Sequence, residues 1–174
     1  MFRVLRSTNP FATRSYRLST RAMPFLASYI ESDEVAAMVL DNTLKSGKDY
    51  LVVDVRDDDF EGGHIPEAIH IRSSILLDKL DDLVNEYANV PKIVFHCVMS
   101  QVRGPKSAQM YKETLSLNGI QTQQQVYVLR GGFRQWQARF KNDPDMIADY
   151  RPELWASEFD DASGSGNVDA ENPR

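Results

Sequence analysis

The sequence predicts an α/β domain with a central parallel sheet and helices on both faces of that sheet. Short runs rich in Val and Ile alternate along the chain with longer segments in which apolar residues recur at helical spacing. The short runs are apolar almost throughout, which is typical of strands buried on both faces of a parallel sheet. Strands that alternate with helices require crossover connections, and these place the helices on the two faces.

Four strands and four helices are expected. The strands are predicted at residues 50–55, 68–71, 92–96 and 125–129, and the helices at about residues 33–44, 76–87, 104–117 and 133–140. Ser32 is the expected N-cap of the first helix, because its hydroxyl can accept a hydrogen bond from a free backbone N–H. Pro105 suits the first turn of the third helix.

One folded domain, residues 27–156, is expected between two tails. Residues 1–26 form a basic leader, and the first 22 are rich in Arg, Ser and Thr without an acidic residue. That composition is typical of a mitochondrial transit peptide and predicts a mitochondrial location. Translation from Met23 would instead give a shorter form, located in the cytoplasm or nucleus. Residues 157–174 are acidic and rich in Ser and Gly, so we expect a disordered tail.

Composition argues against several classes of partner. The net charge is −5, and the five arginines of residues 1–30 leave 15 basic and 25 acidic side chains for the rest of the chain. Nucleic acid requires a basic surface, so it is not expected as a partner. The longest apolar run, residues 35–40, is far too short for a membrane span. A single cysteine and three dispersed histidines predict neither a disulfide nor a metal site. Oligomeric state cannot be inferred from the sequence.

The segment after the third predicted strand carries the candidate chemistry. Ligands of open parallel sheets bind beyond the carboxyl ends of the strands, and Cys97 directly follows one such end. Free N–H groups at the start of the next helix favour an anion, and they favour a thiolate over a thiol. Arg103, at that helix start, presents a planar guanidinium that can hold two oxyanion oxygens. We therefore expect Cys97 and Arg103 to be catalytic, although a buried inert cysteine is the alternative. The expected substrate-binding loop comprises Val98, Met99, Ser100, Gln101, Val102 and Arg103.

Three motifs in this sequence resemble those of the rhodanese superfamily. The first is the loop motif His96-Cys97-x5-Arg103-Gly104-Pro105. The others are Asp54-Val55-Arg56 followed by residues 60–65, and residues 128–133 followed by Trp136. The loop is most similar to that of the M-phase inducer phosphatases and of the related eukaryotic arsenate reductases. The resemblance covers residues 30–155 and implies a rhodanese-like three-layer fold.

The resemblance implies two activities, which stay open at this point. In a cysteine-dependent phosphatase, Cys97 would attack the phosphorus of a phosphorylated substrate and form a phosphocysteine. In an arsenate reductase, Cys97 would attack that small oxyanion, and glutathione or glutaredoxin would supply the second thiol. No other cofactor is implied. Sulfur transfer is disfavoured because sulfurtransferases of the superfamily have a loop one residue shorter. A non-catalytic phospho-binding module is disfavoured by the intact Cys97 and Arg103.

The loop departs from the inducer phosphatases at Val98 and Val102, where those enzymes carry glutamates. No carboxylate within the loop can therefore protonate a leaving group, so we expect a preference for good leaving groups such as nitrophenolate. The arsenate reductases also lack these glutamates. An acid outside the loop would remove the limit, and Asp57, Asp58 and Asp59 are the first candidates. On sequence alone, these three are interpreted as a solvated charge run.

The remaining polar residues of the motifs are expected to support the loop. Asp54 and Arg56 are interpreted as a structural pair beneath it, and His96 as a residue that orients it from below. Ser100 either donates to the sulfur or fills space. Arg130 is expected to pair with a surface carboxylate.

Overall fold

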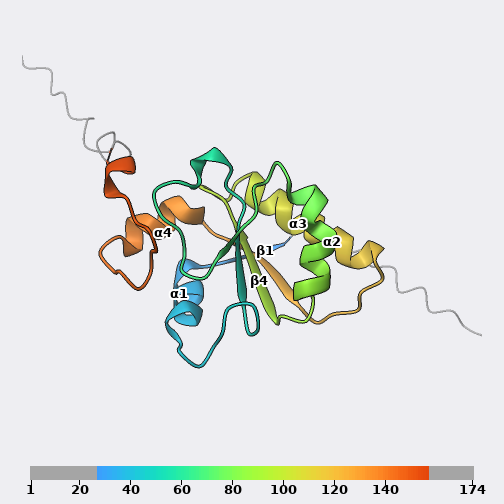
Figure 1. The fold of residues 1–174 in the computed structure, drawn as a ribbon. Coiled ribbons are helices and arrows are strands. Elements are labelled where there is room, and N and C mark those ends of the chain that lie inside the picture. The colour runs from blue at the N-terminus through green and yellow to red at the C-terminus, as the bar shows by residue number, and fades with distance from the viewer. Residues whose placement is uncertain (1–26, 157–174) are drawn as a thin grey trace, which may run out of the picture.

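A computed structural model of the protein describes residues 27–156, which form a parallel sheet covered by helices (Figure 1). The strand order is β1-β5-β4-β2-β3, and every pairing is parallel. The strands are β1 (Ser28–Ile30), β2 (Leu51–Asp54), β3 (Ile69–His70), β4 (Lys92–His96) and β5 (Gln125–Leu129). The helices are α1 (Ser32–Leu40), α2 (Leu76–Tyr87), α3 (Arg103–Leu117) and α4 (Gly132–Phe140), with short 3-10 turns η1 (Asp58–Phe60) and η2 (Pro152–Leu154). The predicted leader, Met23 and the acidic tail lie outside the described residues.

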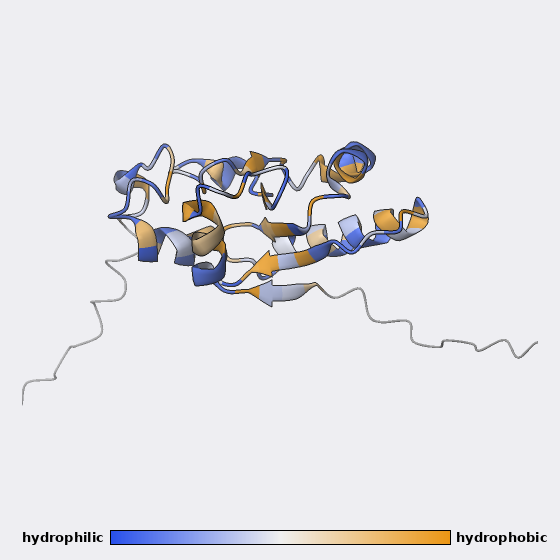
Figure 2. Cartoon of the chain, turned by 90° about the horizontal axis from the view of Figure 1, so that it is seen from below, coloured by the Kyte–Doolittle hydropathy of each residue, from blue (hydrophilic) through white to orange (hydrophobic). Residues whose placement is uncertain are grey.

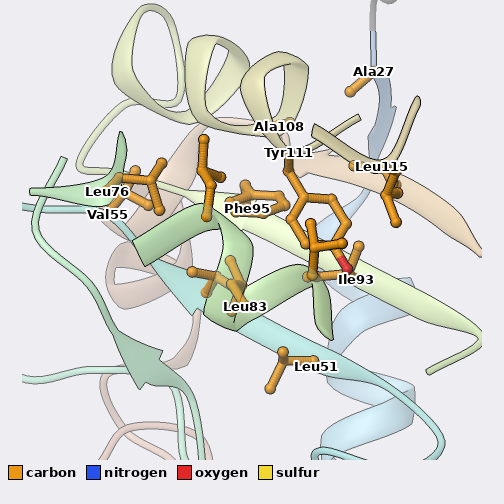
Figure 3. Packing of buried hydrophobic residues seen from close by; sticks show 14 of the residues in the cluster. Ala27, Leu51, Val55, Leu76, Leu83, Ile93, Phe95, Ala108, Tyr111 and Leu115 are labelled. Carbon is orange, nitrogen blue, oxygen red and sulfur yellow. The ribbon is translucent and has the colours of Figure 1, made fainter. Parts of the chain in front are cut away.

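The sheet separates two apolar cores because successive strand residues point to opposite faces. Leu51, Val53 and Phe95 pack with α2 and α3 in the first core, part of which is shown in Figure 3. Val52 and Val94 pack with residues of α1 and α4 in the second. Figure 2 shows apolar segments along the strands at the centre of the molecule. The predicted three-layer α/β architecture is confirmed.

All eight predicted elements are present, and the structure adds β1, which the sequence did not indicate. This strand has only three residues at the sheet edge, and two of them are exposed, so it lacks the apolar run of the other strands. Its pairing with Tyr127, Val128 and Leu129 of β5 defines it instead. Tertiary pairing, rather than local pattern, creates this edge strand.

The predicted boundaries of the first helix are wrong at both ends. Glu31, not Ser32, is the N-cap, and it forms a reciprocal capping box with Glu34. The helix ends at Leu40 rather than at residue 44, because Asp41 is extended. The Asp41 carboxylate accepts hydrogen bonds from the Thr43 N–H and hydroxyl at 2.9 and 2.6 Å. Such a side-chain-closed turn competes with helix continuation.

The carboxyl ends of three strands converge and position the candidate loop. Asp54 at the end of β2 pairs in register with His96 at the end of β4. The turn after β5 leads into α4, whose first N–H groups reach the chain just after β4. Phe133 N donates to Cys97 O at 2.9 Å, and Arg134 N donates to Val98 O at 2.8 Å. Within residues 27–156, no helix is both long and apolar enough to cross a membrane.

Candidate active site

The loop between β4 and α3 curls around the sulfur of Cys97. Ser100 N lies 3.2 Å from Cys97 Sγ and donates to it, while Cys97 N donates to Ser100 Oγ at 3.4 Å. Ser100 adopts a positive φ of 53°, a conformation uncommon for a residue other than glycine. An N–H aimed at sulfur stabilises negative charge there. Ser100 therefore makes two contacts with Cys97: its backbone N–H donates to the sulfur, and its hydroxyl oxygen accepts from the Cys97 N–H.

A glycine pair before α4 allows this helix to approach the loop. Gly131 and Gly132 have φ values of 72° and 59°. A Cβ on Gly132 would collide with the carbonyl oxygens of Cys97 and Val98, the latter at 2.6 Å. These two carbonyls accept the hydrogen bonds from α4 described above. Glycine adopts these backbone angles without strain, and the turn thereby lets α4 hold the first residues of the loop.

Asp54 and Arg56 form a buried ion pair beneath the loop, as expected. Arg56 Nη2 lies 2.6 Å from Asp54 Oδ2, and Arg56 Nε lies 2.9 Å from the same oxygen. The guanidinium also donates to Gly63 O at 2.8 Å and lies over the rings of Phe60 and Phe133, 4.9 and 4.1 Å from their centroids. Burial alone would raise the pKa of Asp54, but the neighbouring His96, together with the hydrogen bonds and charge of Arg56, holds that pKa below its usual value. The carboxylate thus stays charged inside the protein.

His96 lies between this pair and the backbone of Cys97. The ring is fully buried, with Nδ1 3.4 Å from Cys97 O and Nε2 3.7 Å from Asp54 Oδ2. Burial lowers the pKa of His96, so the imidazole is neutral at physiological pH. Its contacts are to the backbone carbonyl of Cys97, not to the sulfur. This placement agrees with an orienting role from below.

The interpretation of the acidic run as merely solvated is wrong for two of its three residues. Arg103 Nη1 contacts Asp57 Oδ2 at 3.1 Å and Asp59 Oδ1 at 2.7 Å, and Arg103 Nη2 contacts Asp59 Oδ2 at 2.5 Å. Asp58 makes no contact with Arg103 and instead lies in an exposed pair with Arg72. Contacts of Asp59 and Asp57 raise the pKa of Arg103. The sequence gave no indication of this cluster, because Asp59 and Asp57 lie 44 and 46 residues before Arg103 in the chain. Only the fold brings them together.

The other predicted loop residues divide between the rim and the interior. Met99, Gln101 and Val102 are exposed, while Val98 packs against the core that contains α1 and α4. Beside the loop, Gln101 and Val102 line a cavity of about 360 Å³ together with Tyr29 and Lys106. Met99 and Val102 give the loop rim an apolar part, and its polar donors are the Gln101 amide, backbone groups and Arg103. Their role in substrate binding remains a prediction.

Residues outside the loop take structural positions. Arg130 pairs with Glu31 at 2.6 Å on the surface, as expected. Trp136 and Trp155 are buried, and their indole N–H groups donate to Met146 O and Gly62 O. Among residues 27–156, no group of three His, Cys, Asp or Glu side chains could hold a metal ion.

Comparisons with known proteins agree with the fold and the motifs. Dual specificity phosphatase ibp1 of Schizosaccharomyces pombe is 32% identical over 135 residues, which are 69% of this chain and 95% of that protein. Arsenate reductase 2.2 of Oryza sativa is 32% identical over 112 residues, 63% of this chain and 82% of that protein. The solved structure of Ygr203w, described as a yeast protein tyrosine phosphatase of the rhodanese family, matches with a TM-score of 0.62 at 29% identity. That match covers 74% of this chain and 96% of the other.

These findings confirm the resemblance drawn from the motifs, and M-phase inducer phosphatase 1 of Homo sapiens is also among the relatives. The model of the rhodanese-like domain matches residues 35–139, more than half of the chain. That segment runs from α1 to α4 and includes the whole Cys97 loop. The chain belongs to the rhodanese-like domain family.

Proposed function

We propose that the protein is a cysteine-dependent phosphatase that acts through a phosphocysteine at Cys97. The observation that carries this proposal is the curled loop, in which a backbone N–H points at Cys97 Sγ and an arginine stands at the loop's far end. A sulfur stabilised as thiolate is the reactive form of cysteine. The names of the phosphatase relatives support the same activity.

The reaction has two steps. Cys97 Sγ attacks phosphorus, while the loop N–H groups and Arg103 hold the equatorial oxygens, and the ester oxygen leaves. Water then attacks the phosphocysteine, releases phosphate and restores the thiolate. The buried Asp54–Arg56 pair and His96 touch no reacting atom in this scheme, and they hold the loop in position.

Arsenate reduction is the second candidate, favoured by the absence of a carboxylate at Val98 and Val102 and by a relative named arsenate reductase. Cys97 would attack arsenic and displace a hydroxyl as water. With no second cysteine in the chain, glutathione would attack the Cys97 sulfur. This step forms a mixed disulfide while arsenic(V) is reduced to arsenic(III), and glutaredoxin would then release Cys97.

One parallel assay separates these functions. Separate samples of the purified protein are assayed with an aryl phosphate, with arsenate plus glutathione and glutaredoxin, and with thiosulfate. We expect hydrolysis of the aryl phosphate, and Cys97→Ser should abolish it while fold and phosphate binding persist, because the loop N–H groups remain. Activity of the serine variant above a few per cent of wild type would rule out nucleophilic catalysis by Cys97. Turnover of thiosulfate alone would identify a sulfurtransferase.

A further inference from the structure

We propose that Asp59 is the proton donor of this reaction, and that substrate binding releases it by taking Arg103 away. This inference rests on the proposed phosphatase activity and names the acid that the loop itself lacks. It stands on the contacts of Arg103 with Asp57 and Asp59, on the other hydrogen bonds of those two carboxylates, and on their exposure relative to Cys97.

The hydrogen-bonding fork of Arg103 is already occupied by carboxylates. Arg103 binds Asp59 in a bidentate ion pair, in which each terminal nitrogen donates to one carboxylate oxygen. Arg103 Nη1 also donates to Asp57. These are the same two nitrogens that would hold two oxygens of a phosphate. A bound oxyanion in the fork therefore displaces Asp59, and this exchange is feasible because the Arg103 side chain is 29% exposed.

Asp57 and Asp59 differ in the hydrogen-bond donors that they keep once Arg103 has moved. Asp57 keeps the Ser73 hydroxyl at 2.6 Å and the Ser74 N–H at 3.1 Å. Burial alone would raise the pKa of Asp57, but these donors together with Arg103 hold that pKa far below its usual value. Asp59 keeps the N–H of Asp57 at 2.9 Å. Since the hydrogen bond from Arg103 is the main cause that lowers the pKa of Asp59, that pKa rises once the contact is lost.

The surrounding charges favour proton uptake at Asp59 when substrate is bound. Arg103 faces Asp59 from the start of α3, and Asp57 faces it from its own segment. Arg56 reaches only the backbone carbonyl of Asp59, at 3.4 Å, and Arg72 is paired with Asp58. A phosphate dianion beside the Cys97 thiolate makes this region strongly negative, which raises the pKa of a neighbouring carboxyl. Of the two carboxylates that Arg103 holds, the one with fewer other donors, Asp59, takes the proton.

Asp59 is also more accessible to solvent than the attacking sulfur. Cys97 is buried at the base of the loop, with 3% of its surface exposed, whereas the Asp59 side chain is 38% exposed. In an in-line displacement the leaving oxygen is opposite the attacking sulfur. The leaving group therefore departs towards solvent, to which the Asp59 carboxyl also has access.

Asp59 gives up one proton in the first step and regains one in the second. As the S–P bond forms and the P–O ester bond breaks, the Asp59 carboxyl transfers its proton to the departing oxygen and becomes a carboxylate. Asp59 then accepts a proton from the water that attacks phosphorus, the S–P bond breaks, and Cys97 returns to the thiolate. No co-reactant besides water is needed.

The test is a series of aryl phosphates whose leaving groups span a wide range of pKa, hydrolysed by wild type and by Asp59→Asn. We expect the variant to lose about 10²–10⁴-fold in kcat/KM for phenyl phosphate, the usual contribution of general acid catalysis, and to lose much less for nitrophenyl phosphate. The slope of log kcat/KM against leaving-group pKa should steepen, and the basic limb of the pH profile, on which the acid loses its proton, should disappear. Asp59→Glu should recover part of the loss.

Asp58→Asn is the matched control, since Asp58 is adjacent, exposed and absent from the Arg103 contacts. It should behave as wild type across the series. Inorganic phosphate, measured as a competitive inhibitor, should bind Asp59→Asn at least as tightly as wild type, because the competing carboxylate charge is gone. Weaker phosphate binding, or an equal loss for every leaving group, would mean that Asp59 only positions Arg103 and would overturn the proposal. A wild type that hydrolyses no ester would instead overturn the phosphatase function itself, and this proposal with it.

Discussion

Two sets of aspartate–arginine contacts, whose aspartates lie within six residues of one another in the sequence, differ in their exposure to solvent. The Asp54–Arg56 pair is buried, with side-chain exposures of 1% and 0%. The cluster of Arg103 with Asp57 and Asp59 has exposures of 29%, 28% and 38%. The residue types are the same, and the difference in solvent access decides what each set can do.

A buried ion pair cannot exchange partners, because each charge would be left without solvation. An exposed ion pair is worth only about 0–1 kcal/mol, so a phosphate can compete for the arginine. The first set is therefore fixed in place, and we infer that the second can open when Arg103 takes a ligand. Four predictions follow this contrast from the largest expected effect to the smallest.

The largest effect should come from Arg56→Met. The substitution leaves the Asp54 carboxylate buried without its partner, so the free energy of unfolding should fall by about 3–5 kcal/mol. Urea denaturation followed by circular dichroism measures this change. Arg103→Met, the control at the exposed cluster, should cost only about 0–1 kcal/mol. Equal losses in the two variants would contradict the contrast between the sites.

Arg103→Lys should show the reverse pattern, with stability kept and activity lost. Lysine keeps the positive charge but not the planar fork, so the rate should fall by about 10²–10³-fold, as for the loss of a key oxyanion donor. Steady-state hydrolysis of nitrophenyl phosphate is the measurement. Near wild-type kinetics would show that Arg103 does not hold the transition state.

Gly132→Ala should disturb the support of the loop. The new Cβ would collide with backbone carbonyls of Cys97 and Val98, and the positive φ is itself unfavourable, so we expect a loss of stability of about 1–3 kcal/mol with reduced turnover. Gly119→Ala is the matched control, since Gly119 also has a positive φ but nothing lies within 4 Å of its added Cβ. The control should cost about 1–2 kcal/mol and leave turnover unchanged. Equal turnover in both variants would show that Gly132 does not support the loop.

The smallest effect concerns pH. The pKa of Asp57 is lower in the folded protein than its usual value of 3.8, so its ionised form stabilises the fold at neutral pH. This contribution is complete above the unfolded-state pKa and disappears as pH falls below about 4 towards the folded-state pKa. Denaturation at several pH values should show Asp57→Asn less stable than wild type at pH 7. The two proteins should converge in acid, and a constant difference would exclude this linkage.

The sequence alone predicted the order of all the strands and α-helices except β1, and it singled out Cys97 as the candidate nucleophile. Buried parallel strands need continuous apolar runs, so β2, β4 and β5 could be predicted from local composition. Cys97 and Arg103 were recognisable because their spacing and their place between a strand and a helix are contiguous in the chain. Where a cap depends on two competing side chains, as at Glu31 and Ser32, the local pattern was insufficient.

Only the tertiary structure decided how the acidic run is used. Asp57, Asp58 and Asp59 look alike in the sequence, and a charge run in a loop usually faces solvent. The fold brings two of them to Arg103, across more than 40 residues of chain, and leaves the third exposed. It also brings Ser73 to Asp57 alone, and so distinguishes two neighbouring carboxylates. Such differences arise from contacts between separate segments, which the strand register sets and which no local pattern encodes.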